Sequence, residues 1–243
     1  MKNNNSHTLA AQSSQSTDYR TLAARVGIIS GFVFILLLAF VWSGATAGMD
    51  LAITTRVVHH RIGFLNPIAL GFTALGGTII VILLTIIALG YLAYRRKWLE
   101  VEIVFGALAG DVVIVTALKK LVNRQRPSSA LWLGHVEDQQ SFPSGHSANN
   151  TVLWLTVALV LTMIAVNEAE RTAAKVMTIL GFIMPLCIGW SRIYTAQHWT
   201  SDVLSGWSLG LAWVSIVAWV YLNQREKRKK ARENATPRIV SSK

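Results

Sequence analysis

The apolar stretch Phe32-Val33-Phe34-Ile35-Leu36-Leu37-Leu38 lies within a longer apolar run from Val26 to Ala47. A helix rises about 1.5 Å per residue, so roughly 20 apolar residues span the hydrocarbon core of a bilayer. The run is therefore predicted to be a transmembrane helix. Ala45-Thr46-Ala47 resembles a signal-peptidase site. The polar region before the run is long for a signal peptide, so we expect a retained anchor.

Five further apolar runs follow this first one. They cover residues 76–94, 101–118, 148–166, 173–190 and 203–222. Only 14% of the residues are charged, whereas soluble domains average about 25%. The sequence therefore predicts an all-α polytopic membrane protein with six transmembrane helices, which fill one domain over residues 26–222.

The two ends of the chain differ from this domain in composition. Residues 1–25 are mostly Asn, Ser, Gln and Thr in their first part, and they are predicted to be a disordered cytoplasmic N-terminus. Residues 223–243 form a basic tail, and eight of the 23 Lys and Arg residues lie in the last 19 positions. The net charge of +11 is thus concentrated beside a membrane span. This favours contact with an anionic leaflet over nucleic-acid binding.

The basic residues also predict the orientation of the spans. Six spans place both termini on the same side of the membrane. That side carries 16 of the Lys and Arg residues, and the opposite side carries seven. Because cytoplasmic loops are enriched in Lys and Arg, we expect both termini to be cytoplasmic in the cell membrane.

Three polar stretches between 119 and 202 fall on the outer side of this predicted topology. The first holds Lys119 and, six residues further on, Arg126-Pro127; the second is Phe142-Pro143-Ser144-Gly145-His146; the third holds Ser191-Arg192, His198 and Asp202. In an otherwise apolar chain these stretches are the candidate functional site.

The cations of these stretches indicate an anionic ligand. Lys119, Arg126 and Arg192 would repel one another unless an anion lay among them, and guanidinium groups match the oxygens of a phosphate. The turn at Ser144 and Gly145 would add a hydroxyl and backbone N–H groups at the start of the fourth span. A helix N-terminus attracts negative charge.

The two histidines suit covalent phosphate chemistry. His198 and Asp202 are four residues apart, so they share one face if a helix begins there. A carboxylate at one ring nitrogen fixes the tautomer and leaves the other nitrogen able to attack. His146 would then be available as the proton donor to the leaving oxygen.

In order and spacing, the three stretches resemble the signature motifs of the type 2 phosphatidic acid phosphatase family, which is related to the vanadium haloperoxidases. The resemblance covers about residues 30–222 and implies the helical core of that family. It implies that His198 forms a phosphohistidine, that Asp202 orients it, and that His146 acts as general acid and then as base. It further implies a phosphate site, formed by Lys119, Arg126, Ser144, Gly145 and Arg192. No metal or other cofactor is implied.

The sequence thus predicts a metal-independent membrane lipid phosphatase that acts at the outer face. Candidate substrates are phosphatidic acid, phosphatidylglycerol phosphate and undecaprenyl diphosphate. A phosphotransferase with the same intermediate stays open, because the sequence does not define the acceptor, and it does not define the oligomeric state. A haloperoxidase is disfavoured by the six spans and the short chain. A channel, transporter or scaffold is disfavoured by the intact histidine pair.

Several other polar residues receive structural interpretations. Asp111, inside the third span, is expected to have an internal hydrogen bond or ion pair. Lys120 and Arg124 are interpreted as headgroup contacts or as part of a solvated face. Cys187 is the single cysteine, so no disulfide can form within the chain. His59 and His60 are interpreted as surface residues rather than metal ligands.

Overall fold

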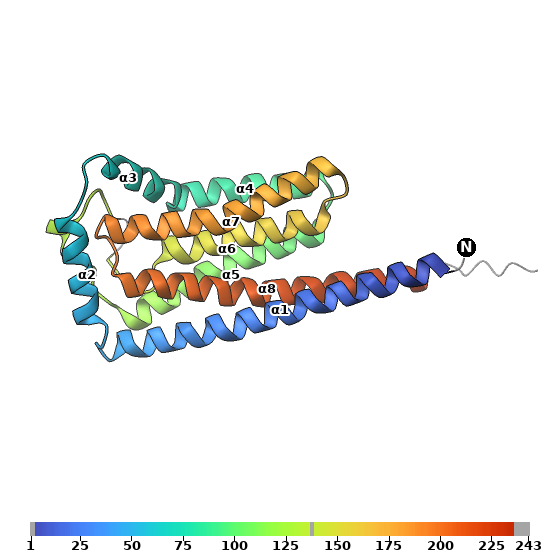
Figure 1. Ribbon diagram of the computed structural model, residues 1–243, viewed down its shortest axis with the longest axis horizontal. Helices are drawn as coiled ribbons and strands as arrows, with labels where there is room; N and C mark the ends of the chain where they lie inside the picture. The colour runs from blue at the N-terminus through green and yellow to red at the C-terminus, as the bar shows by residue number, and fades with distance from the viewer. Residues whose placement is uncertain (1–2, 137–138, 236–243) are drawn as a thin grey trace, which may run out of the picture.

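The computed structural model describes residues 3–136 and 139–235, and these residues form helices and loops with no strand. The helices are α1 (Asn3–Trp42), α2 (Ala47–His59), α3 (Leu65–Leu75), α4 (Thr78–Tyr94), α5 (Trp98–Val122), the 3₁₀ helix η1 (Ser129–Leu131), α6 (Gly145–Ile164), α7 (Glu168–Tyr194) and α8 (Thr200–Ala235). The long helices lie side by side in one bundle (Figure 1).

The six-span prediction is confirmed. Five helices are long and apolar enough to cross a membrane: α1 from Asp18, α5, α6, α7 and α8. A sixth span is reached when the bent pair α3 and α4, which meet at an angle of 51°, is counted as one. Consecutive spans run in opposite directions (Figure 1). The three polar stretches therefore lie at one end of the bundle.

Residues 1–25 are predicted to be disordered; residues 1–2 lie outside the described residues, and the structure describes the helix α1 from Asn3 onward. The helix packs antiparallel along α8 (Figure 1). Arg20 forms an ion pair of 2.6 Å with Glu226 and donates a 3.0 Å hydrogen bond to Asn223 Oδ1. The composition of the N-terminal segment does not reveal these contacts of Arg20, because Asn223 and Glu226 lie about 200 residues further along the chain. Likewise α8 continues past 222 to Ala235.

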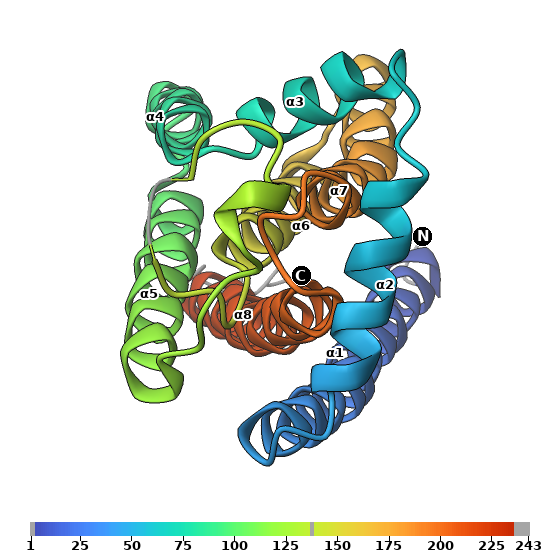
Figure 2. The same cartoon turned by 90° about the vertical axis from the view of Figure 1, so that its left-hand side faces the viewer.

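Two short helices cover the end of the bundle that carries the polar stretches. Figure 2 views this end and shows α2 running across it beside α1 and α8, with α3 between α4 and α7. The buried residues of α2 are Asp50 and Thr54, both polar. The side of α2 that faces the bundle therefore fully buries no apolar side chain, and Asp50 provides its hydrogen bonds.

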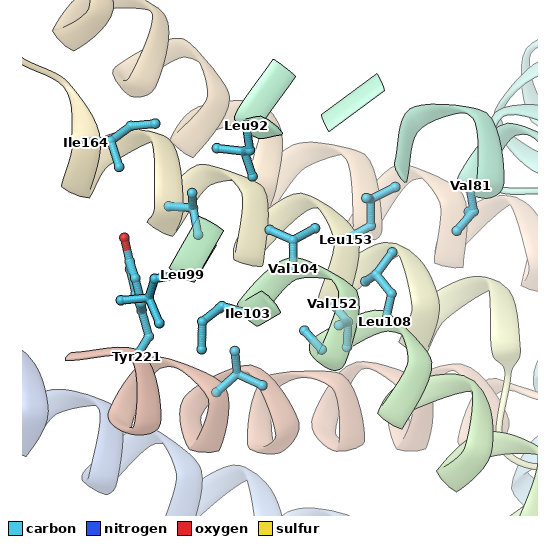
Figure 3. Close-up of a cluster of buried hydrophobic side chains, with 13 residues drawn as sticks. Val81, Leu92, Leu99, Ile103, Val104, Leu108, Val152, Leu153, Ile164 and Tyr221 are labelled. Atoms are coloured by element: carbon cyan, nitrogen blue, oxygen red, sulfur yellow. The ribbon is translucent and has the colours of Figure 1, made fainter. Parts of the chain in front are cut away.

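The apolar core lies among α4, α5, α6 and α8. Figure 3 shows Val104, Val152, Leu153 and Tyr221 within this cluster. Over an apolar stretch of 18 residues, 56% of α6 is buried, compared with 11% of the corresponding stretch of α1. α6 is therefore the central helix, and α1 is a peripheral one whose many exposed apolar side chains suit contact with lipid.

α6 and α8 approach closely at two glycines of α8. A Cβ atom added at Gly206 would lie 2.6 Å from the Ser144 carbonyl oxygen and 2.8 Å from Ser147 Cβ. One added at Gly210 would lie 2.7 Å from Thr151 Cβ. Small residues let helix backbones approach in this way. The crossing fixes the start of α6 against the start of α8.

Candidate active site

The first and second polar stretches are joined by backbone pairing. Gln125 and Gln140 form an isolated antiparallel bridge, and the Ser141 N–H donates to the Arg124 carbonyl oxygen at 2.8 Å. Lys119 Nζ donates to the Gln140 carbonyl oxygen at 2.7 Å. The stretch from Lys119 to Arg126 therefore runs beside the segment that leads into Ser144.

The Ser144 turn begins α6, as the sequence predicts. Ser144 is the N-cap residue, and its side-chain oxygen accepts from the Ser147 backbone N–H at 3.4 Å and from the Ser147 hydroxyl at 3.1 Å. Ser144 N–H donates to the Asp202 carbonyl oxygen at 3.1 Å. A Cβ atom at Gly145 would lie 3.8 Å from Lys119 Cε. The turn thus connects the cation of the first stretch to the carboxylate residue of the third.

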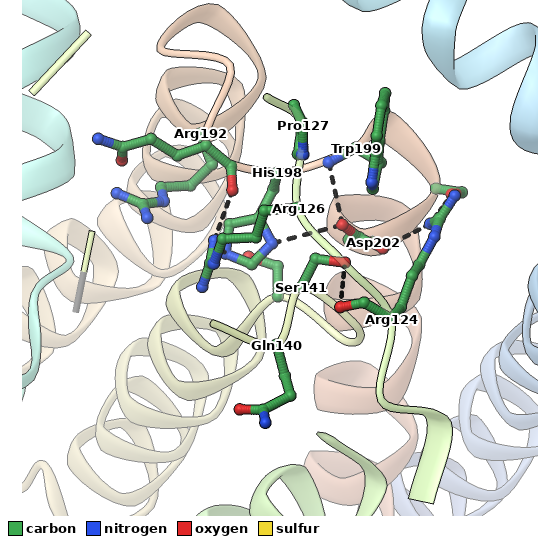
Figure 4. Close-up of polar contacts among 12 residues, drawn as sticks. Arg124, Arg126, Pro127, Gln140, Ser141, Arg192, His198, Trp199 and Asp202 are labelled. Atoms are coloured by element: carbon green, nitrogen blue, oxygen red, sulfur yellow. Dashed lines mark hydrogen bonds and ion pairs between the residues drawn. The ribbon is translucent and has the colours of Figure 1, made fainter. Parts of the chain in front are cut away.

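His198 lies between an arginine and an aspartate, and its side chain is only 1% exposed. Arg126 Nη1 lies 2.8 Å from His198 Nε2. A guanidinium group has donors only, so Nε2 is the acceptor and the ring proton resides on Nδ1. Nδ1 faces Asp202 Oδ2 at 3.5 Å, which is long for a hydrogen bond. Figure 4 shows the histidine between the two partners.

The remaining predicted cation belongs to the same cluster. Arg192, at 2% exposure, is buried, and its carbonyl oxygen accepts from the His198 N–H at 3.2 Å and from the Gln197 N–H at 3.1 Å. Arg126 Nη1 also donates to the Gln197 carbonyl oxygen. The loop between α7 and α8 is thereby folded around the histidine.

The electrostatic environment keeps the His198 ring neutral. Burial lowers the pKa of His198 well below 6.5, because a charged ring would lose its hydration. The positive charges of Arg126, Arg192 and Lys119 lower it further. The partly exposed His146 acts in the same direction. The structure thus brings together the residues that the sequence selects, with His198 at their centre.

The sequence interpretation of Arg124 is wrong, and Asp50 was missed. Arg124 Nη1 forms an ion pair of 2.6 Å with Asp202 Oδ1, and Nη2 forms one of 2.7 Å with Asp50 Oδ2. Its guanidinium also lies 5.6 Å from the centre of the Trp199 ring. Arg124 is therefore an internal cation rather than part of a solvated face. Asp50 lies on α2, and nothing in its spacing relates it to the three stretches.

Asp202 has three side-chain contacts. Besides Arg124 and His198, it accepts from the Trp199 backbone N–H at 2.9 Å through Oδ2. The carboxylate is fully buried, so the Arg124 guanidinium and the Trp199 N–H replace water that it has lost. Its orientation is consequently set by the first turn of α8 and by Arg124.

Asp111 has the internal hydrogen bond that was expected. It lies in α5 at 1% exposure. Two acceptors lie beside the side-chain amide of Asn149: Asp111 Oδ2 and the Gly145 carbonyl oxygen. With its nitrogen turned toward them, the amide donates to Oδ2 at 2.9 Å and to the carbonyl oxygen at 3.2 Å. The pair links the middle of α5 to the first turn of α6.

Residues 133–135 are joined to the loop between α7 and α8 by hydrogen bonds. Leu133 N–H donates to the Thr195 carbonyl oxygen at 2.9 Å, and Gln197 Nε2 donates to the carbonyl oxygens of Leu133 and His135 at 3.0 Å. These bonds hold residues 133–135 against the loop between α7 and α8. Within the part of the chain that the structure describes, no three His, Cys, Asp or Glu side chains are grouped to hold a metal ion.

Comparison with known sequences identifies relatives of this chain. The family described as PAP2 superfamily matches residues 99–226. Phosphatidylglycerophosphatase B of Bacillus subtilis is 34% identical over 187 residues, which cover 75% of this chain and 89% of that protein. Undecaprenyl-diphosphatase of Sulfolobus acidocaldarius is 36% identical over 78 residues, which are 32% of each chain.

The fold is also found among solved structures. The crystal structure of a transmembrane PAP2-type phosphatidylglycerolphosphate phosphatase from Bacillus subtilis superposes with a TM-score of 0.71 and 28% identity. The match covers 83% of this chain and 96% of that one. Its extent shows that both chains share one helical architecture.

Proposed function

This chain belongs to the PAP2 superfamily, and we propose that it is a membrane lipid phosphatase that forms a phosphohistidine at His198. The observation that carries the proposal is the state of the His198 ring. Nε2 is an acceptor facing Arg126, and the protonated Nδ1 faces Asp202. A neutral imidazole held in this tautomer is a nucleophile.

The first step transfers the phosphoryl group to the enzyme. Arg126 moves its donor from His198 Nε2 to a phosphate oxygen, and Nε2 attacks phosphorus. The N–P bond forms, and the bond between phosphorus and the lipid oxygen breaks. A protonated His146 gives its proton to the leaving oxygen. General acid assistance of this kind is typically worth about 10²- to 10⁴-fold.

The second step releases inorganic phosphate. The now neutral His146 takes a proton from a water molecule, whose oxygen attacks phosphorus while the N–P bond breaks. Asp202 stabilises the charge that forms on the His198 ring in the first step. Lys119, Arg126 and Arg192 stabilise the negative charge on the transferring phosphoryl group in both steps. Ser144 and the N–H of Gly145 complete the phosphate site.

The substrate proposed is a lipid phosphate in the outer leaflet of the cell membrane. The site lies at one end of six spans, so a headgroup would reach it while the acyl or prenyl chain stays in the bilayer. Basic residues are enriched at the opposite end, which supports an extracytoplasmic site. The relatives support phosphatidylglycerol phosphate first and undecaprenyl diphosphate second, and phosphatidic acid is the third candidate.

The test is phosphate release by purified protein from these three lipids, with and without EDTA, beside His198→Ala. We expect release that survives EDTA and is lost in the variant. Loss of release with EDTA would contradict metal independence. Radiolabel that passes to a second lipid, without free phosphate, would replace hydrolysis by phosphate transfer.

A further inference from the structure

We infer that Arg124 and Asp50 are positioning residues, which act through Asp202 on the catalytic histidine. This inference rests on the proposed function, in which Asp202 holds the His198 tautomer. It assigns a role in the reaction to two residues outside the three motif stretches, one of them on α2.

Arg124 is the only cation whose ion pairs join Asp202 to Asp50 within residues 3–136 and 139–235. Nη1 lies 2.6 Å from Asp202 Oδ1 and 2.7 Å from the Ser201 hydroxyl oxygen. Nη2 lies 2.7 Å from Asp50 Oδ2. Both carboxylates are 0% exposed. One planar guanidinium with fixed donors thus sets the distance and the relative orientation of two buried carboxylates.

Asp50 fixes the same region from the other side. Its Oδ1 accepts from the Ser201 N–H at 2.9 Å, and its Oδ2 accepts from the Ser201 hydroxyl. The first N–H groups of a helix have no partner within the helix. A carboxylate from α2 therefore caps the N-terminus of α8, one residue before Asp202, and holds the Arg124 guanidinium.

These contacts restrict where the Asp202 carboxylate can point. Arg124 binds Oδ1, which leaves Oδ2 toward the Trp199 N–H and His198 Nδ1. Without Arg124, Asp202 and Asp50 would be two buried carboxylates with no cation between them. Such a pair repels and rotates or takes up a proton. In either case Asp202 would hold the Nδ1 proton of His198 less well.

The expected effect is on turnover rather than on substrate binding. Arg124 contacts residues behind His198, whereas the proposed phosphate site lies on the Nε2 side of the ring. A misplacement of about 1 Å by a remote change can lower the rate roughly 10²-fold. We expect Arg124→Gln to lower kcat by that factor with KM near that of the wild type. Asp50→Asn should lower kcat about tenfold, since the ion pair between Arg124 and Asp202 remains.

A double variant separates positioning from independent effects. If Asp50 acts through Arg124, Arg124→Gln combined with Asp50→Asn should lose about as much kcat as Arg124→Gln alone. If the two substitutions acted independently, their effects would multiply, and kcat of the double variant would fall roughly 10³-fold.

Arg124→Lys should restore part of kcat, because an ammonium supplies the charge without the second nitrogen that binds Asp50. Arg56→Gln is the matched control, since it removes an exposed arginine from α2, and it should leave kcat unchanged.

All variants are purified in detergent, checked by gel filtration, and assayed on the lipid that the wild type hydrolyses best. Folded Arg124→Gln with wild-type kcat, or a raised KM with unchanged kcat, would overturn the inference. If Arg124→Gln does not fold, kcat of Asp50→Asn tests the inference in its place, because that substitution leaves no unpaired buried charge. A wild type that releases no phosphate would instead refute the proposed function itself.

Discussion

At the scale of single residues, the proposed chemistry rests on His198. Its charge state follows from burial first and from the neighbouring cations second. The motif spacing was sufficient to select His198, Asp202 and His146, because each lies at a helix start or in a short loop next to one. It was insufficient for Asp50 and Arg124. Their pairing depends on how α2 crosses the end of the bundle, which no local spacing records.

The lowered pKa of His198 predicts the acid limb of the pH profile. The ring must be neutral to attack, and it is neutral above its pKa. The limb that reports His198 should therefore lie below pH 6.5. Lys119→Met removes one of the cations that lower this pKa, so the limb should move to higher pH. The measurement is kcat/KM against pH for both proteins.

The substrate provides the control in this comparison. The phosphate group of the substrate titrates in the same way with both proteins. The difference between the two pH profiles therefore reflects ionisable groups of the enzyme. A limb that stays in place, or moves to lower pH, would contradict the proposed electrostatic role of Lys119.

Gly145 provides a test of close phosphate approach. A Cβ atom there would lie 3.8 Å from both Lys119 Cε and Val115 Cγ1, which is ordinary contact. Gly145→Ala should therefore keep the thermal unfolding midpoint of the wild type. It should lower kcat/KM about tenfold or more, because in the proposed site the methyl group would occupy the space of a phosphate oxygen. Unchanged kcat/KM would mean that the phosphate does not approach this backbone.

At the scale of elements, the spans were predictable and their surface pairings were not. Apolar runs predicted six spans because lipid requires long apolar helices. The helical region before 26 was missed because its ion pair with α8 is distant in sequence. The short helices α2 and α3 were missed because they bury few apolar residues, namely none on α2 and Ala69 on α3.

The crossing of α6 and α8 can be tested at Gly206. A methyl group at this position would overlap the Ser144 carbonyl oxygen and Ser147. Gly206→Ala should therefore lower the free energy of unfolding by roughly 1–3 kcal/mol. It should also lower activity, because the turn of the proposed phosphate site would shift. Unfolding in detergent and phosphate release measure the two effects.

Gly106→Ala is the matched control for this substitution. Gly106 also lies in a membrane-spanning helix, α5, and a Cβ atom there meets nothing within 4 Å. It should have wild-type stability and activity. Equal stability of the two variants would show that the α6–α8 crossing tolerates a larger residue than its geometry indicates.

At the scale of the whole molecule, the orientation of the bundle decides which leaflet supplies the substrate. Cysteine labelling tests it in a Cys187→Ala background, because Cys187 is the single cysteine. Ser128 is exposed at the end of the bundle that carries the candidate site, and Lys230 is exposed near the end of α8. Each is replaced by cysteine, as Ser128→Cys and Lys230→Cys. A membrane-impermeant maleimide should label the first in intact cells and the second only after permeabilisation. The reverse pattern would place the site in the cytoplasm.

The proposed mechanism depends on a covalent intermediate, so the most direct measurement is to trap it. Wild-type protein is mixed with ³²P-labelled lipid phosphate, and the reaction is stopped with alkaline detergent within a single turnover. We predict protein-bound label that is stable in base, is lost in acid and maps to His198. His198→Ala should carry none. Rapid phosphate release by the wild type without any labelled protein, or equal labelling of His198→Ala, would contradict a phosphohistidine at His198.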